Sequence, residues 1–298
     1  MSTSAESAGA PASVPAPWVG MVDDAAIFPP GNAPLPDAVA AYRERRDEPW
    51  APMVGPLVVS DRSLPDLGSL LAGDDDVPAV PISVVCSGGA GSLGPAAHWA
   101  GETAGAELRA LEIALRDLDD LPGSARRVVR AAEAVAVSGV EVPVHVEVPL
   151  PAHGEPTPGW LDALDEIAAA DLRLKFRTGG PGADLVPGTE ALAAGIEAAL
   201  DRELAFKCTA GLHHAVRGHD PATGTVQHGF LNVLLATRAS LDGQDALAAL
   251  AETGRDAVLG RVDEVGTDAL ARARRWFGSF GCCGVEDPYR DLVDLGLL

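Results

Sequence analysis

Basic residues are scarce in this chain of 298 residues, which has 22 lysines and arginines against 43 aspartates and glutamates. The formal net charge of -21 argues against binding to DNA or RNA, because nucleic-acid affinity comes from clustered cations that neutralise phosphates. We therefore expect no nucleic-acid partner. The sequence leaves open whether copies of the chain form a homo-oligomer.

Apolar runs long enough to cross a membrane are absent as well. A membrane-spanning helix needs about 18 or more apolar residues in succession, and the chain contains no such run. Residues 1–16 lack both the basic start and the continuous apolar stretch of a signal peptide or an anchor, so we expect them to form a disordered tail. We expect a soluble protein with no membrane partner, in which residues 17–298 form one domain.

Cysteine occurs four times, at Cys86, Cys208, Cys282 and Cys283, without the spacing of a disulfide framework. A disulfide between the two adjacent cysteines would be strained, so we expect a reducing, cytoplasmic environment. The segment 281–284 can hold a reactive thiol. Because no base lies near it in the sequence, a structural role is the simpler interpretation.

From Trp18 onward, short apolar runs alternate with segments rich in Ala, Leu, Glu and Arg, as in parallel strands joined by crossover helices. We expect seven strands, at residues 19–25, 56–60, 80–87, 108–115, 142–150, 172–178 and 204–209. We expect helices between them at residues 36–46, 125–135, 160–170 and 189–202. Seven or eight such units over about 250 residues favour a TIM-type (β/α)8 barrel. An open doubly wound parallel sheet is the alternative.

The chain turns helical after the seventh predicted strand, and the sequence does not place an eighth strand. We expect a helical C-terminal region that closes the barrel or covers one end of it. Its predicted helices lie at residues 228–240, 246–253 and 267–277.

Three consecutive predicted strands carry polar side chains at every second position, whereas strands of a covered parallel sheet are usually apolar throughout. These side chains are His145 and Glu147, then Arg173, Lys175 and Arg177, then Lys207 and Thr209. A period of two puts them on one face of the sheet. We expect this face to line the barrel interior, towards the end where barrel enzymes assemble their sites.

Lys175 and Lys207 are the only lysines in the chain. An ε-amine can lose its proton when burial or neighbouring charges lower its pKa, whereas a guanidinium stays charged. A lysine on a buried strand is therefore a candidate nucleophile. Together with Glu147 and Arg177, the two lysines predict a cationic pocket for a small anionic substrate. The alternative is that they balance carboxylates in a polar core.

Glycine-containing turns follow both lysine strands. Glycine there lets backbone N–H groups approach a phosphate or carboxylate, although an ordinary strand-to-helix turn is the alternative. The residues expected to bind the anionic group are Arg177, Thr178, Gly179, Gly180 and Gly211.

The stretch 174–213 resembles class I (Schiff-base) aldolases of the deoxyribose-phosphate aldolase type. In that family a lysine precedes a Thr-Gly pair, and a second lysine on a later strand precedes a turn that contains glycine. The resemblance implies that Lys175 forms the Schiff base and that Lys207 lowers its pKa. Glu147 is the candidate for the acidic residue that the family carries on an earlier strand. Arg177 stands where the family has a small hydroxyl residue, which favours a divergent relative that acts on another anionic carbonyl compound.

Histidines cluster after the last predicted strand. We expect one of His213, His214 and His228 to act as a general acid or base, because imidazole titrates near neutral pH. A metal site formed with Glu147 or Asp24 and a purely structural role are the alternatives.

Asp24 ends the first predicted strand, and its carboxylate is a candidate substrate ligand. A cap on the following turn is the alternative. Asn232 lies about one helical turn after His228 and is expected to reach the same site.

These features predict a lysine-dependent lyase of the aldolase type that needs no cofactor. Its catalytic candidates are Lys175, Lys207, Glu147 and the histidines above. One alternative is a lyase, isomerase or hydrolase that uses a divalent metal held by His213, His228 and Glu147. The other is a non-catalytic barrel that binds an anionic metabolite.

Overall fold

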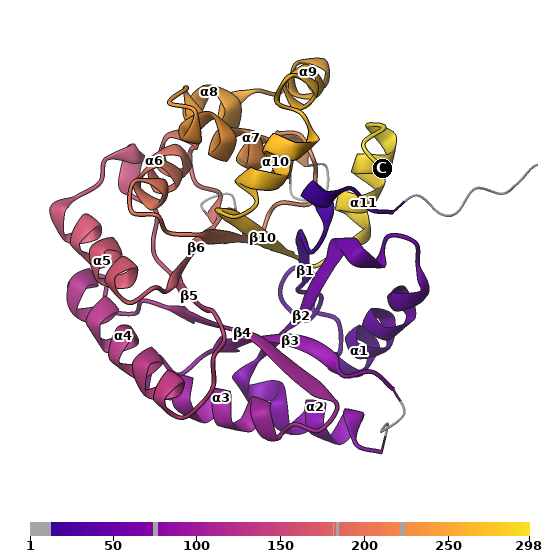
Figure 1. The fold of residues 1–298 in the computed structure, drawn as a ribbon, viewed down its shortest axis with the longest axis vertical. Helices are drawn as coiled ribbons and strands as arrows, with labels where there is room; N and C mark the ends of the chain where they lie inside the picture. The colour runs from indigo at the N-terminus through magenta and orange to yellow at the C-terminus, as the bar shows by residue number, and fades with distance from the viewer. Residues whose placement is uncertain (1–12, 74–76, 181, 183–184, 221–223) are drawn as a thin grey trace, which may run out of the picture.

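The computed structural model describes residues 13–73, 77–180, 182, 185–220 and 224–298. Within these ranges, eight parallel strands close into a barrel that is surrounded by helices (Figure 1). In the order in which they pair, the strands are β1 (Val22–Asp24), β10 (Phe277–Cys282), β7 (Phe206–Thr209), β6 (Arg173–Arg177), β5 (Val144–Glu147), β4 (Ala106–Ala114), β3 (Val80–Cys86) and β2 (Val54–Ser60). The predicted TIM-type (β/α)8 barrel is confirmed, and the alternative of an open sheet is wrong.

The helices surround the barrel (Figure 1). They are α1 (Leu35–Glu44), α2 (Leu64–Leu71), α3 (Leu93–Glu102), α4 (Leu121–Val137), α5 (Pro158–Ala169), α6 (Thr189–Leu200), α7 (Phe230–Leu241), α8 (Ala246–Ala251), α9 (Arg255–Val265), α10 (Thr267–Ala273) and α11 (Glu286–Asp294). Short 3-10 helices lie at Ala16–Trp18, Arg45–Asp47, Ala51–Met53, Asp61–Ser63, Ala90–Ser92 and Ala152–Gly154. A separate antiparallel pair consists of β8 (Gly218–Asp220) and β9 (Thr225–Gln227).

Helices α4 and α5 begin where the sequence supplies start signals. Asp120 Oδ1 accepts a hydrogen bond from the N–H of Gly123 (2.9 Å), and Thr157 Oγ1 accepts one from the N–H of Trp160 (3.3 Å). Such caps satisfy N–H groups that have no partner within the helix. These two helices, with α1, α6, α7 and α8, confirm predictions. The sequence did not indicate α2 and α3, because glycine and proline interrupt their helical pattern.

Strand β10 closes the barrel between β1 and β7. The helix predicted over 267–277 ends at Ala273, and the strand begins at Phe277. Its sequence, Phe-Gly-Ser-Phe-Gly-Cys, is poor in the β-branched residues that mark a strand, which is why it escaped prediction. Its position is held by pairing on both sides, since Phe280 lies opposite Val22 on β1 and Cys208 on β7.

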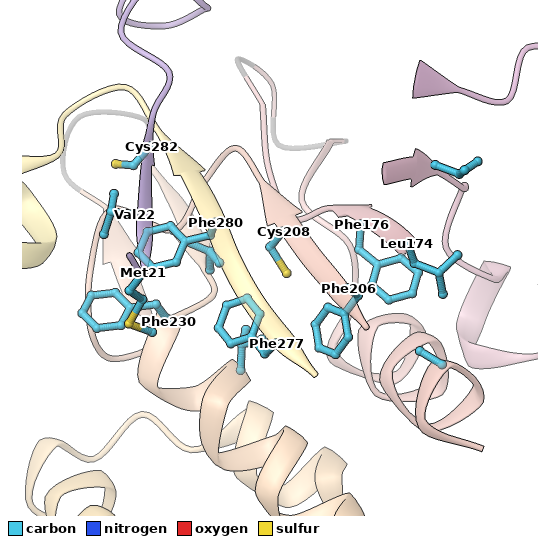
Figure 2. Close-up of a cluster of buried hydrophobic side chains, with 14 of the residues drawn as sticks. Met21, Val22, Leu174, Phe176, Phe206, Cys208, Phe230, Phe277, Phe280 and Cys282 are labelled. Carbon is cyan, nitrogen blue, oxygen red and sulfur yellow. The ribbon is translucent and has the colours of Figure 1, made fainter. Parts of the chain in front are cut away.

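A row of phenylalanine rings packs behind these strands (Figure 2). Ring centroids lie 5.5 Å apart between Phe176 and Phe206, 5.4 Å between Phe206 and Phe277, and 5.3 Å between Phe280 and Phe230 of α7. Aromatic pairs at such distances add about 0.5–1.5 kcal/mol to the burial of their area. The apolar phase of β6 and β7 therefore faces the helices, and the alternate positions face the barrel interior. In β10, the pairing with β7 shifts register between Phe277 and Phe280, so both rings join the row although they are three residues apart.

The N-terminal and C-terminal ends of the described chain lie together. Trp18 is buried, and its indole Nε1 donates a hydrogen bond to the carbonyl oxygen of Leu297 (3.0 Å). Of the predicted tail, residues 1–12 lie outside the described residues, whereas Val14 packs against the core. Among the helices described, none has both the length and the apolar character needed to cross a bilayer.

Candidate functional site

A cavity of about 420 Å³ lies at the carboxyl ends of the barrel strands. Its lining comes from around the barrel, from Ala25 after β1 to Gly281 of β10. Charged side chains form part of this lining: Glu112, Arg116, Glu147, Lys175, Arg177 and Lys207. As predicted, Glu147, Lys175, Arg177 and Lys207 line one cavity at this end of the barrel. His145 and Arg173, from the same polar strand faces, are not among its lining residues.

Glu112 of β4 lies between the two lysines. Its Oε1 is 2.7 Å from Lys207 Nζ, and its Oε2 is 2.9 Å from Lys175 Nζ. Each lysine has a second carboxylate: Glu147 Oε2 lies 3.0 Å from Lys175 Nζ, and Asp23 Oδ2 lies 2.5 Å from Lys207 Nζ. The contact between Lys175 and Glu147 follows from the strand register, because the two residues pair on neighbouring strands. Glu112 and Asp23 instead lie on strands that do not pair with those of the lysines they contact.

Further donors fix the orientation of the three carboxylates. Ser83 Oγ donates to Glu112 Oε1 (2.6 Å), and Ser279 Oγ donates to Asp23 Oδ2 (2.8 Å). The guanidinium of Arg177 donates to Glu147 Oε1 (2.9 Å). A buried charge is costly unless it is paired and hydrogen-bonded, and this network meets that condition.

The protonation states of the lysines follow from these pairs. Burial lowers the pKa of Lys175, but the carboxylates of Glu112 and Glu147 outweigh it, so the pKa lies above its ordinary value. The pKa of Lys207 is likewise raised, by Asp23 and Glu112 against the effect of burial. Lys207 lowers the pKa of Lys175, as expected, but only as a smaller effect. The expectation that Lys175 has a depressed pKa is therefore wrong for the free site.

The carboxyl groups of the cluster behave differently from one another. Burial raises the pKa of Glu112, but Lys207 and Lys175 together hold it well below its ordinary value. The pKa of Asp23 is raised, because burial outweighs its pairing with Lys207. In the free site Glu112 is therefore ionised between the lysines, and Asp23 is the carboxyl that takes up a proton more readily.

The adjacent residues Asp23 and Asp24 of β1 have different partners. Asp24 was the predicted substrate ligand, but it forms a salt bridge with Arg45 and its Oδ1 accepts a hydrogen bond from the N–H of Ala26 (3.0 Å). Asp24 therefore caps the following turn, which was the alternative to a role as substrate ligand. Asp23 was not predicted and lies in the lysine cluster. Glu112 was not predicted either, although a single glutamate between Leu111 and Ile113 was a usable signal.

No protein-family model and no curated protein matches this chain. The resemblance of the stretch 174–213 to class I aldolases stays a prediction, and the function has to be argued from the site itself.

The two glycine turns contact each other above the lysine strands. A Cβ on Gly179 would lie 2.7 Å from the Cα of Gly211, and Gly211 has a φ of +80°. Thr178 Oγ1 donates to the carbonyl oxygen of Ala210 (2.6 Å), which ties the turns together. Gly180 and Gly211 line the cavity. Close packing of the turns therefore requires Gly179 and Gly211. Thr178 and Gly179, which were predicted to bind the anionic group, are not among the residues that line the cavity.

The predicted histidines do not converge. His213 lines the cavity, whereas His214 is paired with Asp291 through Nδ1 (3.4 Å). His228 is fully buried and donates from Nε2 to the carbonyl oxygen of Pro187 (2.8 Å). Burial lowers the pKa of His228 to about 4, so its imidazole is neutral at physiological pH.

Asn232 has a structural role, because its side chain bonds the backbone of neighbouring segments. Its Oδ1 accepts from the N–H of Arg217 (2.7 Å), and its Nδ2 donates to the carbonyl oxygens of Ala249 (2.8 Å) and Glu252 (2.9 Å). These contacts join α7 to the segment around α8. They use both ends of the amide, and Asn232 is not among the residues that line the cavity.

The metal alternative required His213, His228 and Glu147 to meet. Glu147 and His213 line the same cavity, but His228 does not. Among the described residues, no three His, Cys, Asp or Glu side chains are grouped as ligands for a metal ion. The predicted ligand set therefore does not assemble in this structure.

Proposed function

We propose that the chain is a lysine-dependent lyase of the aldolase type, which forms a Schiff base between Lys175 and a small anionic aldehyde or ketone. The observation that carries this proposal is the position of Glu112 between Lys175 and Lys207 at the base of the cavity. Imine formation requires an amine to lose a proton and a carbonyl oxygen to gain protons. A carboxylate in contact with two ammonium groups provides a short path for such transfers.

Lys175 is the better nucleophile of the two lysines. Lys207 is held by Asp23 and Glu112, whose side chains are both almost inaccessible to solvent. Lys175 is held in part by Glu147, whose side chain is 17% exposed and is shared with Arg177. A substrate anion that binds Arg177 would compete for this guanidinium and leave Glu147 free to accept the proton of Lys175.

The mouth of the cavity suits an anionic group. The side chain of Arg177 is 45% exposed, and Arg116 lines the cavity as a second exposed arginine. Guanidinium groups bind carboxylates and phosphates through paired hydrogen bonds. Such a group at the mouth would hold a short substrate with its carbonyl carbon directed to the lysines.

A second candidate function is reversible binding of an anionic metabolite without turnover. The observation in its favour is the raised pKa of Lys175, which keeps the ammonium charged in the free site. A charge-only role predicts that Lys175→Arg retains binding, because guanidinium preserves the positive charge. A nucleophilic role predicts that Lys175→Arg abolishes adduct formation.

Borohydride trapping distinguishes these functions. The full chain is treated with borohydride and a panel of small phosphorylated or carboxylated aldehydes and ketones, and its intact mass is measured. The chain has only two lysines, so the Lys175→Arg, Lys207→Arg and double variants account for every lysine adduct. The double variant is also the control for reaction at the α-amino group. We expect a stable adduct that disappears in Lys175→Arg.

Retention of the adduct in Lys175→Arg would contradict the assignment of Lys175. Protection against thermal unfolding by the same compounds, with no adduct in any variant, would favour the binding function.

We also propose a cytoplasmic setting. It is supported by the four cysteines, each of which is free in the described structure.

A further inference from the structure

A second group of reactive side chains lies at the rim of the same cavity. Cys283 Sγ is 3.5 Å from His213 Nε2, and His213 Nδ1 is 3.1 Å from Asp287 Oδ2. Cys283 and His213 both line the cavity that contains the lysines. A thiol, an imidazole and a carboxylate in this order form the arrangement by which proteins activate a nucleophile and orient its base.

Three separate segments build this arrangement. His213 follows the glycine turn after β7, Cys283 follows β10, and Asp287 lies in the first turn of α11. Closure of the barrel brings the first two together, because β10 pairs with β7. A Cβ on Gly284 would lie 2.7 Å from Asp287 Oδ2, so glycine at this position allows the carboxylate its place beside the imidazole.

The adjacent cysteines differ in environment. Cys282 is buried; its Sγ donates to the carbonyl oxygen of Gly284 (3.3 Å) and lies 3.6 Å from His213 Nδ1. Burial raises the pKa of Cys282, which favours the unreactive thiol. Cys283 is partly exposed and faces His213 Nε2.

The state of His213 is consistent with an activated thiol. Its hydrogen bonds with Cys282 and Cys283 raise its pKa to about 12, so the ring carries a proton at neutral pH. A protonated imidazole at this position can give a proton to an oxygen that forms beside it.

We propose that Cys283 is a second nucleophile of the cavity, activated by His213 and oriented by Asp287, and that it adds reversibly to the carbonyl carbon of a small aldehyde. In this step the thiolate forms a C–S bond, the C=O π bond breaks, and the imidazolium of His213 gives its proton to the oxygen. The product is a hemithioacetal beside a neutral imidazole. The proposal shares with the proposed function only the entry of a small aldehyde into the cavity, and it does not depend on an imine at Lys175.

Alkylation of the unmodified chain tests the activation. The rate of carbamidomethylation by iodoacetamide is followed at each cysteine by peptide mass mapping at neutral pH. We expect Cys283 to react at least about tenfold faster than the other three cysteines. Cys86 is the internal control, because it lines the same cavity but burial raises its pKa to about 12.

Variants then test the role of the imidazole. His213→Gln should slow alkylation of Cys283 by about tenfold or more, whereas His214→Gln should leave it unchanged. His214 is a matched control, since it is paired with Asp291 rather than with a cysteine. Equal rates at Cys283 and Cys86, or an unchanged rate in a folded His213→Gln chain, would overturn the proposal.

The aldehyde adduct is tested in the Lys175→Arg background, where no imine can form at that position. The probe is glycolaldehyde phosphate labelled with carbon-13 at the aldehyde, and the measurement is the hemithioacetal carbon resonance. We expect a resonance that is lost on the further change Cys283→Ser. No such resonance would overturn the proposal. A resonance without any borohydride-trapped adduct in the unmodified chain would support Cys283 and remove the proposed function of Lys175.

Discussion

Lys175 and Lys207 lie opposite each other on neighbouring parallel strands, and Glu112 touches both ammonium groups through different carboxylate oxygens. With Asp23 and Glu147, the cluster contains three carboxyl groups for two lysines. Its members are almost completely buried apart from Glu147. Removal of any one charged group from the cluster should destabilise the fold, because its former partners would remain buried without it.

Removal of the central carboxylate should destabilise the fold. We expect Glu112→Gln to lower the free energy of unfolding by about 3 kcal/mol, since two buried ammonium groups lose a shared partner. Urea denaturation measures this change. Glu107→Gln is the matched control on the same strand. Glu107 pairs with Arg109 at the surface, and its loss should cost less than about 1 kcal/mol. Equal effects of the two changes would contradict the central role of Glu112.

The two aspartates of β1 should separate binding from stability. Asp24→Asn weakens the partly buried salt bridge with Arg45 and should cost about 1–3 kcal/mol of stability. It should leave the binding of small phosphorylated compounds unchanged, because Asp24 is not among the residues that line the cavity. Asp23→Asn changes the partner of Lys207 and should alter that binding. Urea denaturation and ligand-induced shifts in melting temperature measure the two effects. An altered ligand response in Asp24→Asn would contradict the assignment.

The fold was largely predictable from the sequence, because buried parallel strands and amphipathic helices have different periods. The period of two also predicted that Glu147, Lys175 and Lys207 share the barrel interior. Composition could not choose between the adjacent Asp23 and Asp24, since only the phase of a three-residue strand separates them. The closing strand β10 could not be predicted, because its two glycines and its serine lack the β-branched pattern of a strand.

The contact between His213 and Cys283 was beyond sequence reasoning for a related reason. The two residues are 70 positions apart, and they meet only because β10 pairs with β7. Without β10, the sequence pattern gives no base beside the cysteines. The structural role expected for the 281–284 segment followed from that gap.

The phenylalanine row should make β10 sensitive to truncation. Phe277 is fully buried and stacks on Phe206 at 5.4 Å. We expect Phe277→Ala to lower the free energy of unfolding by about 3–5 kcal/mol, from lost burial and the cavity that remains. Val137→Ala is the control, because Val137 is 89% exposed and should change stability by less than about 0.5 kcal/mol. A small loss in Phe277→Ala would show that β10 contributes little to closure.

Stability should fall on mild acidification because of His228. Its folded-state pKa lies near 4, below the ordinary value of 6.5, owing to burial. A histidine whose folded pKa is lowered binds protons more readily when unfolded. Its contribution is therefore present above the unfolded pKa and is lost as the pH falls from 6.5 towards 4. We expect His228 to account for a loss of about 2 kcal/mol between pH 7 and pH 5.

Urea denaturation of the unmodified chain and of His228→Gln at both pH values measures this loss. Glutamine keeps a donor for Pro187 but does not titrate, so the variant should lose less stability on acidification by about that amount. His145, whose pKa burial lowers to about 3, contributes equally in both chains and cancels. The same loss in both chains would show that His228 does not bear this part of the pH dependence.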